Sequence, residues 1–300
     1  MIFKLYNKLT IWTKILILIS LFLICFSIFS VKQEGFKNNK TFTFAEGPIV
    51  YDNFYSTIYD TLVYNKIKNE YEISQIISNT TPSHESVVLD IGCGTGHHVG
   101  LLEEKGFNVI GIDKSENMIQ QAKINYPNGN FKNGDMNNDN LFNNQSFTHI
   151  LCMYFTIYYV EDKTRFFRNA MNWLMPGGYL VVHLVDRDMF DPILPPANPL
   201  VILSPQRYAK ERITKSRVKF DNFSYTANFE LDNKSNLAKF KEKFEFNDGK
   251  VKKQEHKMYM PTQNEIITIA QEMGFILHGV IDLISTGYEY NNLYIFVKPN

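Results

Sequence analysis

Residues 87–98, VVLDIGCGTGHH, join a short apolar run to a glycine-rich loop and a helix start. Gly92, Gly94 and Gly96 stand at alternate positions, where the absence of side chains lets a backbone approach a ligand closely. A helix that begins near residue 97 would present unpaired N–H groups towards that ligand. A tight turn alone would need fewer glycines. The stretch therefore predicts a strand, a ligand-binding loop and a helix of an α/β domain.

The glycine spacing differs from the two best known nucleotide loops. G-x-G-x-x-G would place its third glycine at residue 97, which is a histidine, and no G-x-x-x-x-G-K-[ST] is present. Asp113 follows the next apolar run, 21 residues after Gly92, and a carboxylate at that distance suits the two hydroxyls of a ribose. Asp113 would alternatively serve as a charge at the start of the following helix. Pyrophosphate and triphosphate are the weaker interpretations.

From about residue 47 onward, short apolar runs alternate with amphipathic stretches. Such alternation is typical of a doubly wound α/β fold, whose mostly parallel sheet is covered on both faces. Together with two closing strands, the pattern predicts a seven-stranded sheet. The expected strands are 87–91, 108–113, 129–133, 148–154, 178–185, 275–284 and 292–298, and the expected helices are 59–78, 97–105, 115–125, 162–174 and 262–273. The last two strands should pair antiparallel, because the segment between them is too short for a crossover helix.

Residues 207–260 alternate polar and apolar side chains with period two. An Asn247-Asp248-Gly249 turn separates two such runs, so we expect an antiparallel β insert at about 207–260. The insert holds fourteen Lys and Arg against eight Asp and Glu. It would either cap a substrate pocket, touch an anionic acceptor, or present an ordinary solvated face.

Five ordered elements resemble the class I S-adenosylmethionine-dependent methyltransferases, in particular the type 11/25-like methyltransferase domain. They are DIGCGTG (90–96), VIGIDKSENMIQQAK (109–123), GDM (134–136), SFTHILCMYFTIYYVED (146–162) and WLMPGGYLVVHLVD (173–186). The resemblance covers about residues 50–185 and the closing strands, and it implies a Rossmann-like methyltransferase fold. It also implies S-adenosylmethionine as methyl donor, without a metal.

The resemblance assigns roles to individual residues. Asp90 and the loop Gly92, Cys93, Gly94, Thr95 and Gly96 would hold the methionine part, and Asp113 the ribose. Lys114 or Met118 would cover the adenine face, and Asp135 with Met136 its edge. Tyr154 and Phe155 would border the sulfonium and the acceptor.

Methyl transfer from a sulfonium depends chiefly on in-line alignment, which can supply roughly 7–11 kcal/mol of barrier lowering. A base helps when the acceptor is an alcohol or an amine. The expected candidates are Asp186, His183 and Tyr154. His183 stands in an apolar strand, which favours a core histidine, so Asp186 is the preferred base. The acceptor is a small molecule, a lipid or a protein, because no strong nucleic-acid signal is present. The alternatives are a non-catalytic binding module and an NAD(P)-dependent reductase.

The N-terminal part differs from the rest. Residues 15–31 form an uncharged apolar run whose length is near the lower limit for crossing a membrane as a helix. A short N-terminal segment with a basic character, residues 1–14, precedes it, and a polar linker at 32–46 follows it. We expect an uncleaved membrane anchor rather than a signal peptide, because the run exceeds a usual h-region. Lysines flank it evenly, so charge does not fix its orientation. The donor chemistry favours a cytosolic domain, and three scattered cysteines favour a reducing compartment.

Overall fold

The computed structural model describes residues 10–15, 19–20, 42–197 and 205–300. Residues 42–300 form one compact unit and residues 1–41 another. Within the described ranges, no helix is both long and apolar enough to cross a membrane. Most of the predicted anchor at 15–31, and the predicted linker up to residue 41, lie outside the described residues.

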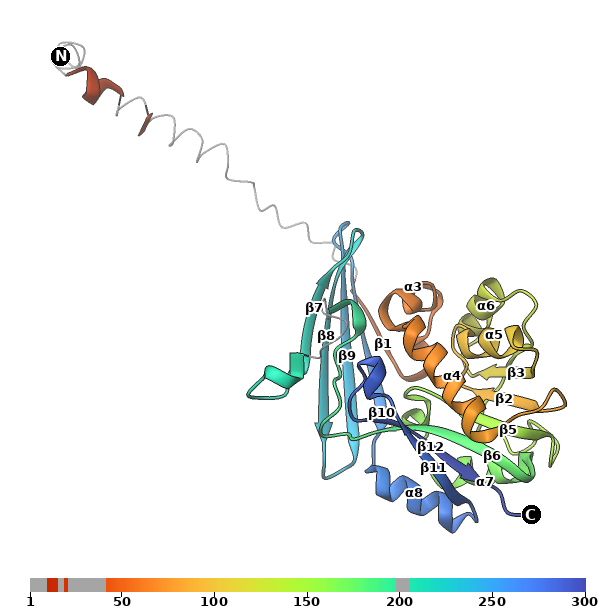
Figure 1. The fold of residues 1–300 in the computed structure, drawn as a ribbon. Coiled ribbons are helices and arrows are strands. Elements are labelled where there is room, and N and C mark those ends of the chain that lie inside the picture. The colour runs from red at the N-terminus through yellow and green to blue at the C-terminus, as the bar shows by residue number, and fades with distance from the viewer. Residues whose placement is uncertain (1–9, 16–18, 21–41, 198–204) are drawn as a thin grey trace. The chain divides into compact units, whose positions relative to one another are not determined.

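A seven-stranded sheet with the order β11-β12-β6-β5-β2-β3-β4 forms the centre of the larger unit (Figure 1). The strands from β6 to β4 in that order run parallel to one another, whereas β12 is antiparallel to both β6 and β11. This confirms the predicted Rossmann-like fold and the antiparallel closing pair. The strands are β2 (Val87–Ile91), β3 (Asn108–Asp113), β4 (Phe131–Asn133), β5 (Phe147–Cys152), β6 (Leu174–Val185), β11 (Ile276–Asp282) and β12 (Asn291–Val297).

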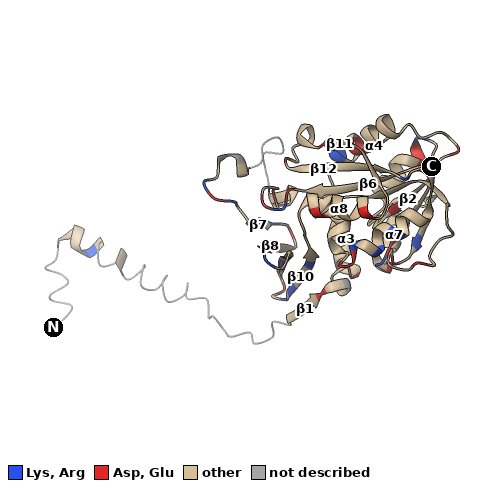
Figure 2. Cartoon of the chain, turned by 90° about the horizontal axis from the view of Figure 1, so that it is seen from below, with Lys and Arg blue, Asp and Glu red and all other residues tan. Residues whose placement is uncertain are grey.

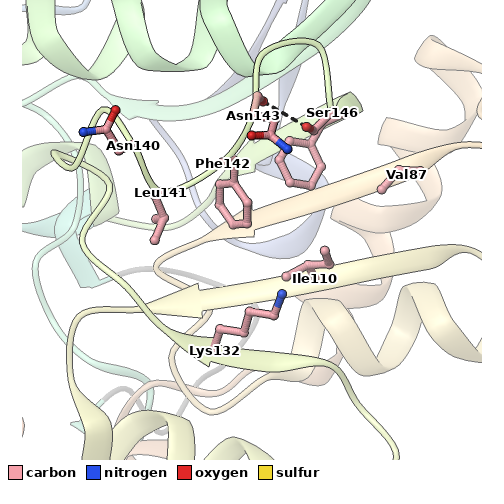
Figure 3. A pocket seen from close by; sticks show the side chains of 9 residues that line it. Val87, Ile110, Lys132, Asn140, Leu141, Phe142, Asn143 and Ser146 are labelled. Carbon is pink, nitrogen blue, oxygen red and sulfur yellow. Dashed lines mark hydrogen bonds between the residues drawn. The ribbon is translucent and has the colours of Figure 1, made fainter.

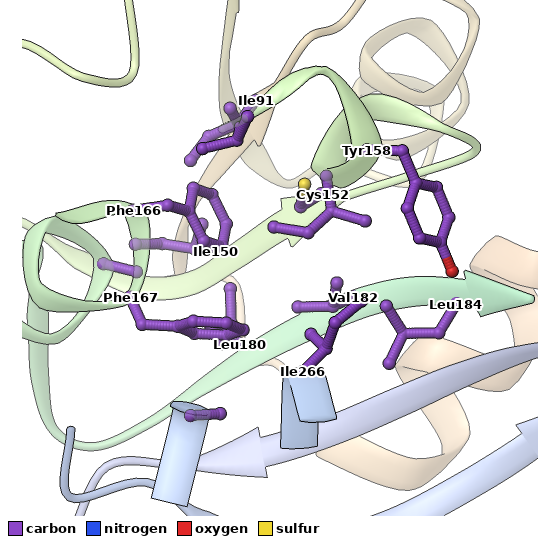
Figure 4. Packing of buried hydrophobic residues seen from close by; sticks show 14 of the residues in the cluster. Ile91, Ile150, Cys152, Tyr158, Phe166, Phe167, Leu180, Val182, Leu184 and Ile266 are labelled. Atoms are coloured by element: carbon purple, nitrogen blue, oxygen red, sulfur yellow. The ribbon is translucent and has the colours of Figure 1, made fainter. Parts of the chain in front are cut away.

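Helices cover both faces of this sheet, because its central strands carry apolar side chains on both sides. On one face, Phe166 and Phe167 of α7 and Ile266 of α8 pack against Ile150 and Leu180 of the sheet (Figure 4). On the other face, a second buried cluster joins α4, α5 and α6 to the strands. The helices are α3 (Asn53–Val63), α4 (Lys66–Thr80), α5 (His97–Glu104), α6 (Glu116–Asn125), α7 (Lys163–Trp173) and α8 (Gln263–Glu272).

The single helix predicted at 59–78 is two helices, α3 and α4. The first helix ends at Tyr64, whose backbone is extended. Asn65 then starts the second as its N-cap, because its side chain accepts the Lys68 backbone N–H at 3.1 Å. Asp52 caps α3 in the same way through Tyr55 N–H at 2.9 Å. The apolar spacing continues across the break, so periodicity alone did not reveal it.

A second, five-stranded sheet has the order β1-β10-β9-β8-β7. Four of its strands lie within the predicted insert and pair antiparallel, with the Asn247–Gly249 turn between β9 and β10. The fifth strand corrects the sequence analysis, which assigned residues 32–46 to a linker. Phe42–Glu46 instead pairs parallel with β10. The strands are β1 (Phe42–Glu46), β7 (Lys215–Lys219), β8 (Phe223–Asp232), β9 (Leu237–Phe246) and β10 (Val251–Tyr259); the 3₁₀ turns are η1 (Gly47–Val50), η2 (Thr156–Tyr159), η3 (Pro195–Ala197), η4 (Pro205–Tyr208) and η5 (Ile284–Thr286).

Candidate active site

The glycine loop follows the last residue of β2, and all three glycines have positive φ: 68° at Gly92, 55° at Gly94 and 90° at Gly96. A Cβ at Gly92 would lie 2.5 Å from the Thr156 side chain, and one at Gly96 would lie 2.7 Å from the Phe131 ring. These two glycines therefore serve close packing. At Gly94 a Cβ would meet only the Tyr59 ring, at 3.8 Å. Gly94 is thus the loop position that a ligand can approach.

Asp90, in β2, is the most unusual charge of the site. It is 1% exposed, and neither carboxylate oxygen has a hydrogen-bond partner within the part of the chain that the structure describes. Burial raises the pKa of this carboxyl to about 7. A buried carboxylate is normally balanced by donors or by a cation. The amino group of a bound amino acid would supply both.

Asp113 lies at the end of β3, next to the glycine loop. One carboxylate oxygen accepts the Gly94 N–H at 3.1 Å, and the other accepts the Ser115 N–H at 2.8 Å. Burial nevertheless raises the pKa of Asp113 to about 6, against the opposing effect of these two donors. Each oxygen keeps further acceptor capacity, so the geometry is compatible with the predicted ribose contact.

Two of the four predicted adenine residues, Lys114 and Asp135, contact each other. Lys114 Nζ and Asp135 Oδ2 form an ion pair at 2.7 Å. Burial opposes ionisation of Asp135, but the Lys114 ammonium and the Asn137 donors lower its pKa. Met118 is buried in α6, and the half-buried Met136 accepts a hydrogen bond at its carbonyl from the Asn169 side chain. The two separate adenine roles expected for Lys114 and Asp135 are thus one coupled pair here.

Helix α3 is fastened to the glycine loop, which the motif analysis did not foresee. Asp60 accepts a hydrogen bond from Thr95 Oγ1 at 2.5 Å and lies 3.0 Å from His97 Nε2. It also accepts from the Asn125 side chain at 3.1 Å. The hydroxyl of Thr95, which was predicted to contact the donor, therefore donates its hydrogen bond to Asp60. Cys93, also predicted to contact the donor, is buried between the loop and β3. No local motif marks Asp60.

Tyr154 and Phe155 follow β5, as predicted for the acceptor side. Tyr154 has a φ of 51°, a strained conformation for a tyrosine, and its ring lies 5.0 Å from the Lys68 ammonium. Lys68 is itself buried and paired with Glu72 at 2.9 Å. The Phe155 ring packs edge-on against Tyr154. This buried ion pair beneath Tyr154 was absent from the sequence-based site.

The structure does not favour His183 as a proton acceptor. It is fully buried, and its ring nitrogens face the Tyr154 carbonyl and, at 3.1 Å, the Asn291 side chain. Burial lowers the pKa of His183 to about 4. Both ring nitrogens have neighbours inside the fold, which favours the core interpretation of His183, and its catalytic role stays a prediction. Asp186 follows β6 and accepts the Asp188 backbone N–H, so its catalytic role stays a prediction.

A cavity of about 300 Å³ lies away from this site (Figure 3). It is lined by Val87, Ile110, Leu141 and Phe142, among others. Val87 is the first residue of β2, whereas the glycine loop follows its last. The cavity therefore belongs to the opposite end of the strand, and it contains none of the residues predicted to bind the donor.

The fold and the glycine loop with its two buried carboxylates are those expected of a class I S-adenosylmethionine-dependent methyltransferase domain, and the comparisons support this class. A family model described as a methyltransferase domain matches residues 88–178. The sequence is 28% identical over 132 residues to a ubiquinone biosynthesis O-methyltransferase of Rickettsia canadensis (strain McKiel), covering 41% of this chain and 52% of that protein. It is 31% identical over 147 residues to a dTDP-4-amino-2,3,4,6-tetradeoxy-D-glucose N,N-dimethyltransferase of Saccharopolyspora spinosa, covering 47% and 58%.

Solved structures share the fold over more of the chain. An S-adenosylmethionine-dependent methyltransferase from Clostridium acetobutylicum superimposes with a TM-score of 0.63 at 18% identity, covering 83% of this chain and 99% of that one. The S-adenosylmethionine-bound amino pentose methyltransferase CalS10 from Micromonospora echinaspora gives 0.59 at 16% identity, covering 82% and 97%. The sequence matches span about half the length of the curated relatives.

Proposed function

We propose that this chain transfers a methyl group from S-adenosylmethionine to a hydroxyl or amino group of a small molecule. The observation that carries the proposal is Asp90, a buried carboxylate without a partner in the described ranges, at the strand end that opens the glycine loop. The relatives named above, an O-methyltransferase and an N,N-dimethyltransferase, support both acceptor chemistries. Lipid and protein acceptors remain outcomes of the test.

Three groups of the chain would hold the donor. Asp90 would balance the ammonium of the donor's methionine part. Gly94, which has no side chain, would let the donor approach the loop backbone closely. Asp113 would accept hydrogen bonds from the ribose hydroxyls. When bound, the donor supplies an electrophilic methyl group on a positively charged sulfur. The chain would contribute orientation and exclusion of water, since in-line displacement depends chiefly on alignment.

The first experiment measures donor binding by titration calorimetry of the full chain with S-adenosylmethionine. Asp113→Asn should weaken binding at least tenfold, because a charge-assisted hydrogen bond to the ribose contributes about 1.5–3 kcal/mol. Asp221→Asn, at an exposed position in the insert, should bind as the wild-type chain does. Absence of donor binding by the wild type would favour the non-catalytic module, and binding of NAD(P) instead would favour the reductase.

The second experiment identifies the acceptor. The full chain is incubated with methyl-labelled S-adenosylmethionine and a cell extract, which is then separated into metabolite, lipid, protein and RNA fractions. Label in the metabolite fraction supports the proposal. Label confined to another fraction would replace the small-molecule acceptor by that class.

We further propose that the apolar run at 15–31 anchors the chain in a membrane, with the methyltransferase domain on the cytosolic side. The uncharged length of the run supports this, as does the cytosolic location that its donor chemistry requires. Protease protection of the full chain in sealed vesicles tests it. A shielded domain would contradict the orientation, and loss of the segment from the mature chain would contradict the anchor.

A further inference from the structure

Tyr159, His256 and Glu242 form a hydrogen-bonded chain between η2 and the five-stranded sheet. Tyr159 Oη lies 2.9 Å from His256 Nδ1, and His256 Nε2 lies 2.7 Å from Glu242 Oε2. His256 is 3% exposed and Glu242 is 2% exposed, whereas Tyr159 is 38% exposed. Of these three residues, Tyr159 is the one whose side chain is partly exposed.

For a neutral His256, the hydrogen bonds set which atoms of this Tyr159–His256–Glu242 series donate and which accept. Burial raises the pKa of Glu242, but the hydrogen bonds from His256, Tyr225 and Gln254 outweigh it and lower that pKa. Glu242 is therefore a carboxylate, which only accepts hydrogen bonds, so His256 Nε2 carries a proton. In a neutral imidazole, Nδ1 is then the acceptor and the Tyr159 hydroxyl is the donor.

Neighbouring residues link Tyr159 to the predicted donor site. Thr156, in the same helical turn as Tyr159, is the side chain that a Cβ at Gly92 would meet. The Tyr51 ring lies 6.0 Å from the Tyr159 ring and 5.5 Å from the His256 ring. The Tyr51 carbonyl in turn accepts a hydrogen bond from Ser115 Oγ at 2.9 Å, two residues after Asp113. The phenol thus stands between the glycine loop and the insert.

Other polar groups around His256 do not compete for Nδ1. Tyr225 Oη and Tyr55 Oη donate to the opposite Glu242 oxygen at 2.5 and 3.2 Å, and Gln254 donates to Glu242 at 2.6 Å. The side chains that face His256 from neighbouring elements are Tyr51, Tyr55, Tyr159, Phe240 and Glu242. Glu242 is the one carboxylate among these side chains. If Nδ1 also takes up a proton, the positive charge of the imidazolium is balanced by Glu242, which contacts Nε2.

We propose, on the basis of the methyltransferase function above, that Tyr159 is a catalytic residue that removes a proton from a hydroxyl or amine acceptor. His256 and Glu242 act as positioning residues behind it. The acceptor oxygen or nitrogen bonds to the methyl carbon, while the carbon–sulfur bond breaks and leaves its electron pair on sulfur. The acceptor proton passes to Tyr159 Oη as the phenol proton passes to His256 Nδ1, and the imidazolium later releases it to water.

The test compares the full wild-type chain with Tyr159→Phe, His256→Gln and Glu242→Gln. The acceptor is the extract fraction that the wild type labels, with methyl-labelled S-adenosylmethionine as donor. We expect transfer to be about 10²-fold slower in Tyr159→Phe and His256→Gln, with donor affinity within about twofold of wild type. The wild-type rate should depend on pH, and this dependence should vanish in His256→Gln.

A second measurement needs no acceptor. Nitrogen NMR of histidine-labelled wild-type chain should show His256 with a proton on Nε2 and a bare Nδ1, and Tyr159→Phe should shift the Nδ1 resonance. The Tyr179 and His278 rings pack edge to face outside the site, with their centroids 5.4 Å apart. Tyr179→Phe and His278→Gln are therefore matched controls that should keep the rate and the pH profile.

Wild-type rates and pH profiles in both Tyr159→Phe and His256→Gln, or a proton on His256 Nδ1, would overturn the relay and leave the methyltransferase function standing. If the wild type neither binds the donor nor labels any fraction, both the relay and the proposed methyltransferase function are wrong. If His256→Gln loses donor binding through misfolding, the partly exposed Tyr159→Phe decides: a slowed rate with intact binding supports the relay, and an unchanged rate overturns it.

Discussion

The backbone N–H of Gly94 donates to the Asp113 carboxylate across 3.1 Å, which joins the open position of the glycine loop to the end of the neighbouring strand. The conformation of the loop and the position of this carboxylate therefore depend on each other. The affinity of a ligand that contacts Asp113 will therefore also depend on the conformation of the loop. A substitution at Gly94 should affect both the loop and the position of this carboxylate.

Replacement of Gly94 by alanine should weaken donor binding. Its φ of 55° costs an L-residue about 1–2 kcal/mol, and the new methyl group would occupy the open space above the loop. Gly249→Ala is the matched control, because its φ is 88° and a Cβ there meets nothing within 4 Å. Both variants should lose similar stability in urea, but only Gly94→Ala should lose donor affinity in calorimetry. Equal affinities would contradict the assignment of the loop.

Asp90→Asn should change how stability depends on pH. Burial raises the pKa of Asp90 from 3.8 to about 7, so between these values the folded chain holds a proton that the unfolded chain has lost. The contribution of Asp90 to the free energy of unfolding therefore falls as pH rises through this window, by at most about 4 kcal/mol. The variant should gain stability over the wild type at pH 8 but not at pH 4.

Urea denaturation of both chains at pH 4, 6 and 8 measures this difference. Asp221→Asn, which changes an exposed carboxylate, should follow the wild type at each pH. A constant offset between Asp90→Asn and the wild type would show that the carboxyl titrates alike in the folded and the unfolded chain, which would contradict the raised pKa. Added S-adenosylmethionine should stabilise the wild type at pH 8 more than the variant, because the ionised carboxylate attracts the donor's ammonium.

Glu72→Gln should destabilise the fold by about 3 kcal/mol, because it leaves the buried Lys68 ammonium without its counter-ion. The same helix offers a control with the same spacing: Lys66 and Glu70 lie 3.7 Å apart with side-chain exposures of 73% and 51%. Glu70→Gln should change stability by no more than about 0.5 kcal/mol. Equal urea midpoints for the two variants would mean that water reaches Lys68.

Asp60→Asn should weaken donor binding without touching the donor. The substitution removes the charge that holds Thr95 and His97 to α3, and hydrogen bonds to charged groups contribute about 1.5–3 kcal/mol each. We expect about tenfold weaker binding and faster hydrogen exchange in residues 53–63. Thr57→Ala, on an exposed position of the same helix, should alter neither. If Asp60→Asn binds the donor with wild-type affinity, the contacts of α3 with the glycine loop do not contribute to donor binding.

Sequence patterns predicted the central fold well, because its signals are local. The strand before Gly92 and the strand ending at Asp113 are continuous apolar runs with polar ends, so their place in a parallel sheet follows from the pattern itself. The period-two alternation of apolar residues around Tyr225 likewise predicted a strand with one apolar face, and that face is the buried one in β8. Asn65, by contrast, shows that a single capping residue can divide a helix whose apolar spacing is unbroken.

The candidate site was predicted only where a motif exists. Asp60 and Lys68 reach the glycine loop and Tyr154 from helices that precede the motif in the chain, and no spacing rule relates them to it. Glu242 and His256 are adjacent only because β9 and β10 pair in one particular register. His183 was open to two interpretations until the structure gave both of its ring nitrogens neighbours.

The parallel pairing of β1 with β10 has a practical consequence for anyone who expresses this domain. A truncation that starts at residue 47, after the expected linker, would strip the outer strand from the insert and leave the amide edge of β10 bare. Such an edge recruits strands from other molecules. Polypeptides that begin before Phe42 should thus be soluble, and shorter ones that lack this strand should aggregate.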